Sequence, residues 1–173
     1  MIGAKPYSTP STSSKRLTKF DGEPLEDQSL CRHIVGVLQY CTLTRPDISF
    51  SLSHVCQFLH CPTTTHFTVA KRVLRYLKGT PDYCLTFTKG LLQLEAFCDS
   101  DWAGDPIDWK STSGYGVFLS TCLISWQSKR QPTTFWSSTE AKYRFVAIAT
   151  AELHWLCMLL KEMRVSFFSP PNF

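Results

Sequence analysis

The spacing of apolar residues changes near residue 80, and this change limits the possible folds more than any other feature of the sequence. Between Asp27 and Gly79, apolar residues recur every three or four positions, which is typical of helices with one buried face. After residues 80–82, apolar and polar residues alternate as they do in strands. A helical first half followed by a half that begins with strands predicts an α+β protein.

The first half predicts three helices behind a leading segment. Residues 1–24 are rich in Ser, Thr and Pro and show little apolar periodicity, so we expect them to be extended. Each helix begins at a capping residue or a proline and ends before a proline or a glycine. The helices are expected from Asp27 to about Leu43, from Pro46 to Leu59, and from His66 to Lys78.

The second half predicts a sheet and one long helix. In the strand expected at residues 92–99, Leu94, Ala96 and Cys98 share one face and Asp99 lies on the other. The long helix is expected from about Ser138 to Met163; it would span on the order of 39 Å, and its apolar content predicts burial on more than one side. Strands are expected at residues 83–88, 92–99, 114–120 and 123–129, with the last two forming an antiparallel hairpin.

Composition predicts a folded protein inside the cell. Apolar residues make up 43% of the chain and aromatic residues 13%, more than a disordered chain carries. The eight cysteines are scattered without a Cys-x-x-Cys pair or a signal peptide, so we expect reduced thiols in a cytoplasmic or nuclear, non-secreted protein. The longest apolar run, around residues 155–160, is far below the roughly 20 residues of a membrane span, so no membrane role is expected.

Positive charge is concentrated in the first half. Residues 1–90 contain 11 Lys and Arg against 6 Asp and Glu, whereas residues 91–173 contain 7 against 8. This imbalance suits a polyanion-binding part next to a carboxylate site. Basic residues of the third helix could follow a phosphate backbone without reading its sequence, although a solvated helix face fits them equally well. These residues are Lys71, Arg72, Arg75 and Lys78, and positions 71, 75 and 78 share one face.

Two carboxylates, Asp99 and Glu140, stand where a strand ends and where the long helix begins. Such places can face each other, and Mg²⁺ prefers oxygen ligands. In two-metal hydrolysis, one ion generates the attacking hydroxide and the other stabilises the leaving oxygen. Structural roles fit as well, because Ser137 and Glu140 have the spacing of a capping box and Asp99 or Asp101 can close a turn. Spacing alone favours the structural roles.

A zinc site is disfavoured by the same reasoning. His54, Cys56, His60 and Cys61 lie close together, but no second ligand pair stands at a recognisable distance. Position 56 also falls on an apolar helix stripe. We therefore expect a structural role for this cluster.

Three groups of motifs resemble the Copia-type retrotransposon Pol polyprotein. Residues 42–48 and 71–80 look like the region between its polymerase and its nuclease. Residues 98–104 and 111–115 look like the opening of its ribonuclease H domain, and residues 137–143 look like the start of that domain's first long helix. In order, they read Thr-Leu-Thr-Arg-Pro-Asp-Ile, Lys-Arg-Val-Leu-Arg-Tyr-Leu-Lys-Gly-Thr, Cys-Asp-Ser-Asp-Trp-Ala-Gly, Ser-Thr-Ser-Gly-Tyr and Ser-Ser-Thr-Glu-Ala-Lys-Tyr.

After the leading segment at 1–24, the resemblance implies the reverse-transcriptase end and connection region at 25–90 and a partial ribonuclease H-like domain at 91–173. It implies hydrolysis of RNA in RNA–DNA hybrids with Mg²⁺, and it makes Asp99 and Glu140 the catalytic, metal-binding carboxylates. The implied partners are RNA–DNA hybrid or other nucleic acid and the remainder of a Pol polyprotein.

The sequence departs from the family at several points, among them Cys31 and Cys41, where tyrosine and leucine are usual. The family's third metal-binding aspartate lies in a strand beyond the long helix and its fourth ligand comes later, whereas this sequence stops at residue 173. Lys142 stands where the family usually has a second glutamate. We therefore expect an incomplete ribonuclease H-like fold, three antiparallel strands plus one long helix, with little nuclease activity by itself. The alternative is a non-catalytic retroelement remnant that binds nucleic acid weakly.

Overall fold

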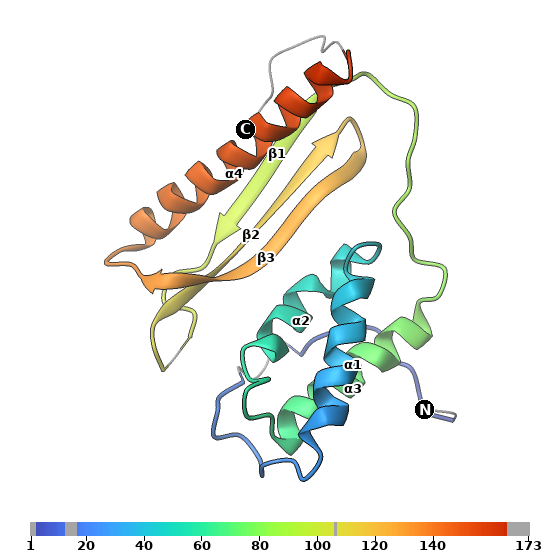
Figure 1. Cartoon of the computed structure of the whole chain (residues 1–173), viewed down its shortest axis with the longest axis vertical. Coiled ribbons are helices and arrows are strands. Elements are labelled where there is room, and N and C mark those ends of the chain that lie inside the picture. Colours follow the sequence, from blue (N-terminus) through green and yellow to red (C-terminus); the bar gives the residue numbers. More distant parts are fainter. Residues whose placement is uncertain (1–2, 13–16, 106, 166–173) are drawn as a thin grey trace. The chain divides into compact units, whose positions relative to one another are not determined.

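A computed structural model describes residues 3–12, 17–105 and 107–165 of the chain. The chain divides into two compact units, Met1–Cys84 and Leu85–Phe173, which we call the helical unit and the sheet unit (Figure 1). Together they contain helices and one antiparallel sheet, which confirms the α+β class. Ser13 and Ser14 of the leading segment lie outside the described residues.

Three helices build the helical unit, as predicted. The second helix differs from the prediction, because it begins as a short 3-10 turn at Pro46 and ends at Cys56 instead of Leu59. Beyond Cys56 the backbone hydrogen bonds span three residues, as in a 3-10 helix. They run from the Phe58 N–H to the Val55 carbonyl and from the Leu59 N–H to the Cys56 carbonyl. The elements are α1 (Gln28–Cys41), η1 (Pro46–Ile48), α2 (Ser49–Cys56) and α3 (Thr64–Gly79).

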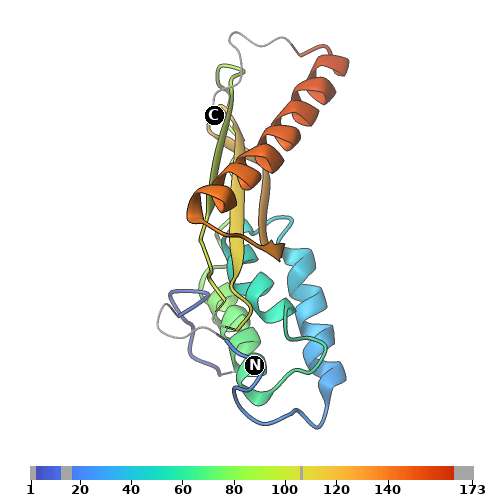
Figure 2. The same cartoon turned by 90° about the vertical axis from the view of Figure 1, so that its left-hand side faces the viewer.

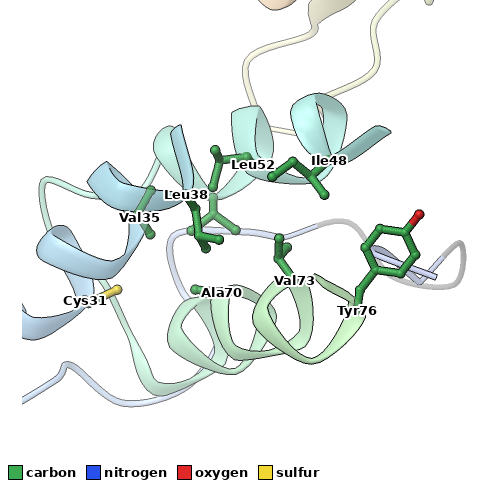
Figure 3. Close-up of a cluster of buried hydrophobic side chains, with 9 residues drawn as sticks. Cys31, Val35, Leu38, Ile48, Leu52, Ala70, Val73 and Tyr76 are labelled. Carbon is green, nitrogen blue, oxygen red and sulfur yellow. The ribbon is translucent and has the colours of Figure 1, made fainter. Parts of the chain in front are cut away.

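The helical unit closes its own hydrophobic core. Side chains from α1, η1, α2 and α3 point toward one another (Figure 3), and their exposed fractions lie between 0 and 6%. Tyr76 places its ring at one end of this cluster. Burying one such aliphatic side chain stabilises a fold by about 1.5–3 kcal/mol. The buried members are Cys31, Val35, Leu38, Ile48, Leu52, Val55, Ala70, Val73 and Tyr76.

Helix caps fix the starts of α1 and α3. The Asp27 carboxylate accepts the N–H groups of Ser29 and Leu30, so of the two possible caps, Asp27 and Ser29, it is Asp27 that caps α1. At α3 the cap is Thr63, and the Thr63 N–H donates in turn to Nδ1 of His66 at 3.1 Å. Since Nδ1 accepts this bond, Nε2 carries the proton that it donates to the Thr18 carbonyl at 3.1 Å. Neutral His66 therefore ties residue 18 to α3.

The sheet unit contains strands in the order β1-β2-β3, all antiparallel, followed by α4. Ser120 and Thr121 form the predicted tight connection between β2 and β3, and Ser120 adopts a φ of 57°, the left-handed conformation that such turns need. The strand predicted at residues 83–88 is wrong, since those residues pair with no ladder. The elements are β1 (Leu94–Ser100), β2 (Lys110–Leu119), β3 (Cys122–Thr134) and α4 (Ser138–Glu162).

One face of the sheet packs against α4, which runs along β1 (Figures 1 and 2). Leu94 and Ala96 are buried on this face, whereas Phe97 is 62% exposed on the other, which confirms the predicted alternation in β1. The buried core cluster of this unit comprises Leu94, Ala96, Val117, Leu153 and Leu156.

The prediction that α4 is buried on more than one side is wrong for the described residues. Its buried positions recur every three or four residues and form one stripe, because the sheet lies on one side only. By length and composition alone α4 could cross a membrane. In the structure its buried stripe packs against the sheet. The buried residues are Ala141, Phe145, Ala149, Leu153 and Leu156, and the exposed apolar residues include Tyr143, Ile148, Trp155 and Met158.

Candidate functional site

The predicted basic face of α3 lies against the leading segment of the chain. Nε of Arg75 donates to the Lys5 carbonyl at 2.6 Å, and Nζ of Lys78 donates to the Ala4 carbonyl at 3.1 Å. Nη2 of Arg72 donates to the Thr9 hydroxyl at 2.8 Å. Residues 72, 75 and 78 therefore make these contacts, whereas the spacing had grouped residues 71, 75 and 78.

Tyr7 is the centre of this contact. Its ring lies 4.2 Å from the Arg72 guanidinium and 4.0 Å from that of Arg75, measured to the ring centroid. Its hydroxyl accepts from Arg75 Nη1 at 3.2 Å, and its backbone N–H donates to the Arg75 carbonyl at 3.4 Å. Lys71 instead lies 4.0 Å over the Phe67 ring. The groups that contact these basic side chains are carbonyls, hydroxyls and aromatic rings, all of them neutral. No carboxylate among these contacts balances the positive charge of α3.

Asp99 lies in β1 opposite Gly114 of β2, on the sheet face turned away from α4. Its side chain is exposed. Within residues 3–12, 17–105 and 107–165, its carboxylate has no recorded hydrogen bond or salt bridge. Asp99 is therefore an exposed carboxylate at the surface of the sheet, and turn closure is not its role in this structure.

Glu140 occupies the first turn of α4 and already has partners. Ser137 caps the helix by accepting the Glu140 N–H at 3.1 Å, as predicted. The reciprocal bond differs from the prediction: Oε2 of Glu140 accepts the N–H of Trp136 at 3.0 Å, not that of Ser137. Nε of Arg144, one turn later, lies 3.3 Å from Oε1 of Glu140. Lys142 is two positions away, so it points elsewhere on the helix.

The aspartates between β1 and β2 shape their own loop. Asp101 accepts the N–H of Thr112 and lies so close to Gly104 that a side chain at residue 104 would collide with it. Asp105 and Asp108 bind the guanidinium of Arg130, at 2.8 Å from Asp105 Oδ2. Asp101 therefore joins the end of β1 to the start of β2, 11 positions away, instead of closing a local turn as predicted.

The two carboxylates differ in their availability to a magnesium ion. A free carboxylate such as Asp99 suits a hard cation. Glu140, in contrast, is engaged by Arg144, and no recorded contact joins it to Asp99. Among the described residues, no group of three or more His, Cys, Asp and Glu side chains could hold a metal ion. These residues do not form a metal site on their own.

A buried charged network was missed by the sequence reasoning. The Arg45 guanidinium binds both oxygens of Asp47, at 3.0 and 2.8 Å, and also binds the carbonyl and hydroxyl of Thr80, at 2.8 and 2.7 Å. The Tyr76 hydroxyl donates to Asp47 at 2.7 Å. Arg45 is only 9% exposed. Arg45 and Asp47 thus meet Tyr76 and Thr80 in one structural clasp, and this pairing could be seen only in three dimensions.

The clasp changes the pKa of its members. Burial alone would raise the pKa of Asp47, but hydrogen bonds from Arg45 and Tyr76, together with the charge of Arg45, lower that pKa below its usual value. Burial and the bond to Asp47 raise the pKa of Tyr76. Asp47 is therefore held in its ionised form.

The serines of the 111–115 motif form a buried polar row in the sheet. The hydroxyls of Ser100 and Ser113 lie 2.7 Å apart, and Nε2 of Gln131 donates to Ser113 at 3.0 Å. The Ser111 hydroxyl accepts the N–H of Ala103 at 3.3 Å. These bonds join residues of all three strands and satisfy buried hydroxyls. The motif thus fixes the sheet beside Asp99.

The sequence is similar to parts of several known proteins. It is 48% identical over 172 residues to the retrovirus-related Pol polyprotein from transposon RE2 of Arabidopsis thaliana, which covers 99% of this chain and 12% of that protein. An uncharacterized mitochondrial protein of the same plant is 49% identical over 90% of this chain and 65% of its own length. The secreted RxLR effector protein 161 of Plasmopara viticola is 44% identical over 75% of this chain and 93% of its own length. No protein-family model and no solved structure match the chain.

Proposed function

The chain belongs to the family of retrovirus-related Pol polyproteins of transposons, and on that premise we propose that it joins the polymerase and ribonuclease H parts of a Copia-type polyprotein. It spans 12% of the length of the RE2 polyprotein. The helical unit would be the connection region. The sheet unit would be the first part of a ribonuclease H-like domain that hydrolyses RNA in RNA–DNA hybrids.

The unpartnered carboxylate of Asp99 is the observation that carries this proposal. A carboxylate that no neighbouring side chain engages is free to bind a hard metal ion together with further oxygen ligands. Glu140 would join it only after exchanging Arg144 for the metal. Bound Mg²⁺ would supply an activated water and stabilise the leaving oxygen. The remaining ligands would come from elsewhere in the polyprotein.

Paramagnetic Mn²⁺, which replaces Mg²⁺ in oxygen sites, tests the ligands directly. In a longer polyprotein segment that supplies the remaining ligands, we expect amide NMR signals around Asp99 to broaden at lower Mn²⁺ concentration than those of the loop at residues 101–110, because Arg130 and Lys110 already pair with Asp105 and Asp108. Asp99→Asn should remove the broadening. The matched control is Asp82→Asn, an exposed aspartate of the helical unit. Preferential broadening at the loop would contradict the assignment of Asp99.

Hydrolysis of a labelled RNA–DNA hybrid tests the activity. We expect this chain alone to show little cutting with Mg²⁺, since it contributes two of the implied ligands. A longer polyprotein segment that contains the chain should cut the hybrid, and Asp99→Asn should abolish that cutting. Cutting that survives Asp99→Asn would remove this residue from the reaction.

A second function, binding of nucleic acid without catalysis, is favoured by the uncompensated charge of α3. Each phosphate neutralised releases counterions, so affinity should fall steeply with salt. Replacing Arg72, Arg75 and Lys78 by alanine should reduce the slope of log K against log salt by up to about 3. Affinity that does not respond to salt, or no binding at all, would exclude this function.

A further inference from the structure

Residues 4–9, which we call the strap, cross the basic face of α3. Their order is antiparallel to the helix, since Ala4 meets Lys78, Lys5 meets Arg75, and Thr9 meets Arg72. The strap carbonyls take hydrogen bonds from all three of these basic side chains. A polyanion on the same face would need the same donors.

Gly79 permits the close approach of the strap at the end of α3. A Cβ atom at this position would lie 2.9 Å from Cβ of Pro6 and 3.3 Å from the Tyr7 carbonyl oxygen. Contacts at these distances are too tight for a side chain. The surface of α3 is thus shaped to take an extended chain beside its basic residues.

The strap is held weakly compared with a strand or a helix. Its one recorded backbone bond to α3 joins the Tyr7 N–H to the Arg75 carbonyl at 3.4 Å. The other contacts use the half-buried Arg72 and Arg75, the exposed Lys78, and two cation–π contacts at the ring of Tyr7, which is 36% exposed. Surface contacts of this kind open locally at low cost. Phosphate oxygens would also form stronger, charge-assisted bonds with the guanidinium groups than neutral carbonyls do.

We propose that the strap is a displaceable cover of a polyanion-binding surface formed by Arg72, Arg75 and Lys78. This inference rests on the proposed nucleic-acid binding by α3 and adds a control to it. Nucleic acid binds molecules in which residues 4–9 have left the helix, so the apparent dissociation constant is the intrinsic one divided by the open fraction. Loosening the strap therefore strengthens binding.

Binding of a fluorescein-labelled RNA–DNA hybrid by the full chain tests the cover. Tyr7→Ala removes both cation–π contacts, and we expect about fivefold tighter binding. Tyr7→Phe keeps the ring and loses only the hydroxyl bond, so its gain should be smaller. Tyr40→Ala is the matched control, because Tyr40 is 77% exposed on α1, and it should leave the affinity unchanged.

Hydrogen exchange in the unmodified chain gives a second readout. We expect the amide of Tyr7 to exchange faster when the hybrid is added, since its bond to Arg75 is lost. Unchanged or slower exchange of the Tyr7 amide would contradict the proposal that the strap is displaced. Unchanged or weaker hybrid binding by Tyr7→Ala would contradict it as well. Loss of the helical circular dichroism signal in Tyr7→Ala would also overturn it, because the strap would then be part of the core.

The failure of the underlying function gives a different pattern. If alanine at residues 72, 75 and 78 leaves hybrid binding unchanged, α3 is not the binding surface. The proposed nucleic-acid binding by α3 and the proposed role of the strap are then both wrong. If those substitutions abolish binding while Tyr7→Ala gives no gain, α3 binds nucleic acid and only the cover is wrong.

Discussion

The two units of this protein bury their apolar residues in different ways. In the helical unit, three helices enclose the side chains from several directions, and even the charged Arg45 is nine-tenths buried. In the sheet unit, α4 covers one sheet face while its own outer side exposes Trp155 at 54% and Met158 at 52%. In the helical unit the apolar side chains are enclosed by three helices. In the described part of the sheet unit, α4 is packed on one side only.

The largest effect should follow from a cavity in the helical core. Leu38 is 1% exposed, so Leu38→Ala should lower the free energy of unfolding of this unit by about 3 kcal/mol. Amide hydrogen exchange in α1 measures the change. All five tryptophans lie in the sheet unit, so tryptophan fluorescence follows that unit separately and should be unaltered. Leu43→Ala, at a site 62% exposed, is the control; equal effects of the two substitutions would break the contrast between core and surface.

A smaller loss should follow from opening the charged clasp. Asp47→Asn keeps the size of the side chain but removes the charge that faces Arg45, and we expect a loss of about 2 kcal/mol. Urea unfolding of the helical unit measures it, with Asp82→Asn as the exposed control. Because the pKa of Asp47 is lowered in the fold, its contribution is present above the usual carboxylate pKa and disappears as pH falls through the lowered value. Asp47→Asn should remove this part of the acid sensitivity, and an unchanged acid transition would argue against the clasp.

The next effect is a pH dependence at His66. Burial lowers the pKa of His66, against the smaller opposing effect of the Thr18 carbonyl. The neutral ring therefore stabilises the helical unit fully above the ordinary histidine pKa of about 6.5, and this contribution is lost as pH falls through the lowered pKa. Urea midpoints measured across this range should show the loss in the unmodified chain and in His33→Gln, an exposed control. His66→Gln should flatten the profile; an unaltered profile would assign it to another group.

The smallest effect on stability is expected at the outer side of α4. Trp155→Ser should change the free energy of unfolding by no more than about 0.5 kcal/mol, because this side chain is mostly in water. Self-association at high concentration should decrease, since an exposed apolar patch is removed. Sedimentation velocity measures the association. A large loss of stability would mean that Trp155 is already buried in the folded chain and would weaken the comparison between the units.

Local patterns predicted most of the elements, because caps and alternating faces depend on residues close in sequence. Asp27, the three helices of the first unit and the two faces of β1 were all visible in this way. The extension of β3 to Thr134 was missed, because its end is polar and is held by pairing with Lys110 of β2. The clasp of Arg45 was missed because its partners are distant in sequence.

The candidate site divides in the same manner. The cap at Ser137 followed from spacing, but the N–H that Glu140 accepts belongs to Trp136 and depends on the path of the chain before α4. The metal-binding roles of Asp99 and Glu140 came from the family resemblance and stay predictions. The strap could not be predicted, because its partners on α3 are about seventy residues away in sequence.

The bond between Arg45 and Thr80 joins residues 35 positions apart, so it closes a loop of chain that contains α2 and α3. In polymer terms it works as a reversible cross-link. Cys61 is exposed between those helices. If the backbone were cut there, the contacts between Arg45 and Thr80 would still hold the two fragments together. Arg32 adds to this by binding the carbonyls of Leu59 and His60, both at 3.0 Å. The helical unit should therefore survive as a non-covalent complex of two pieces, which coexpressed fragments split at residue 61 would reconstitute.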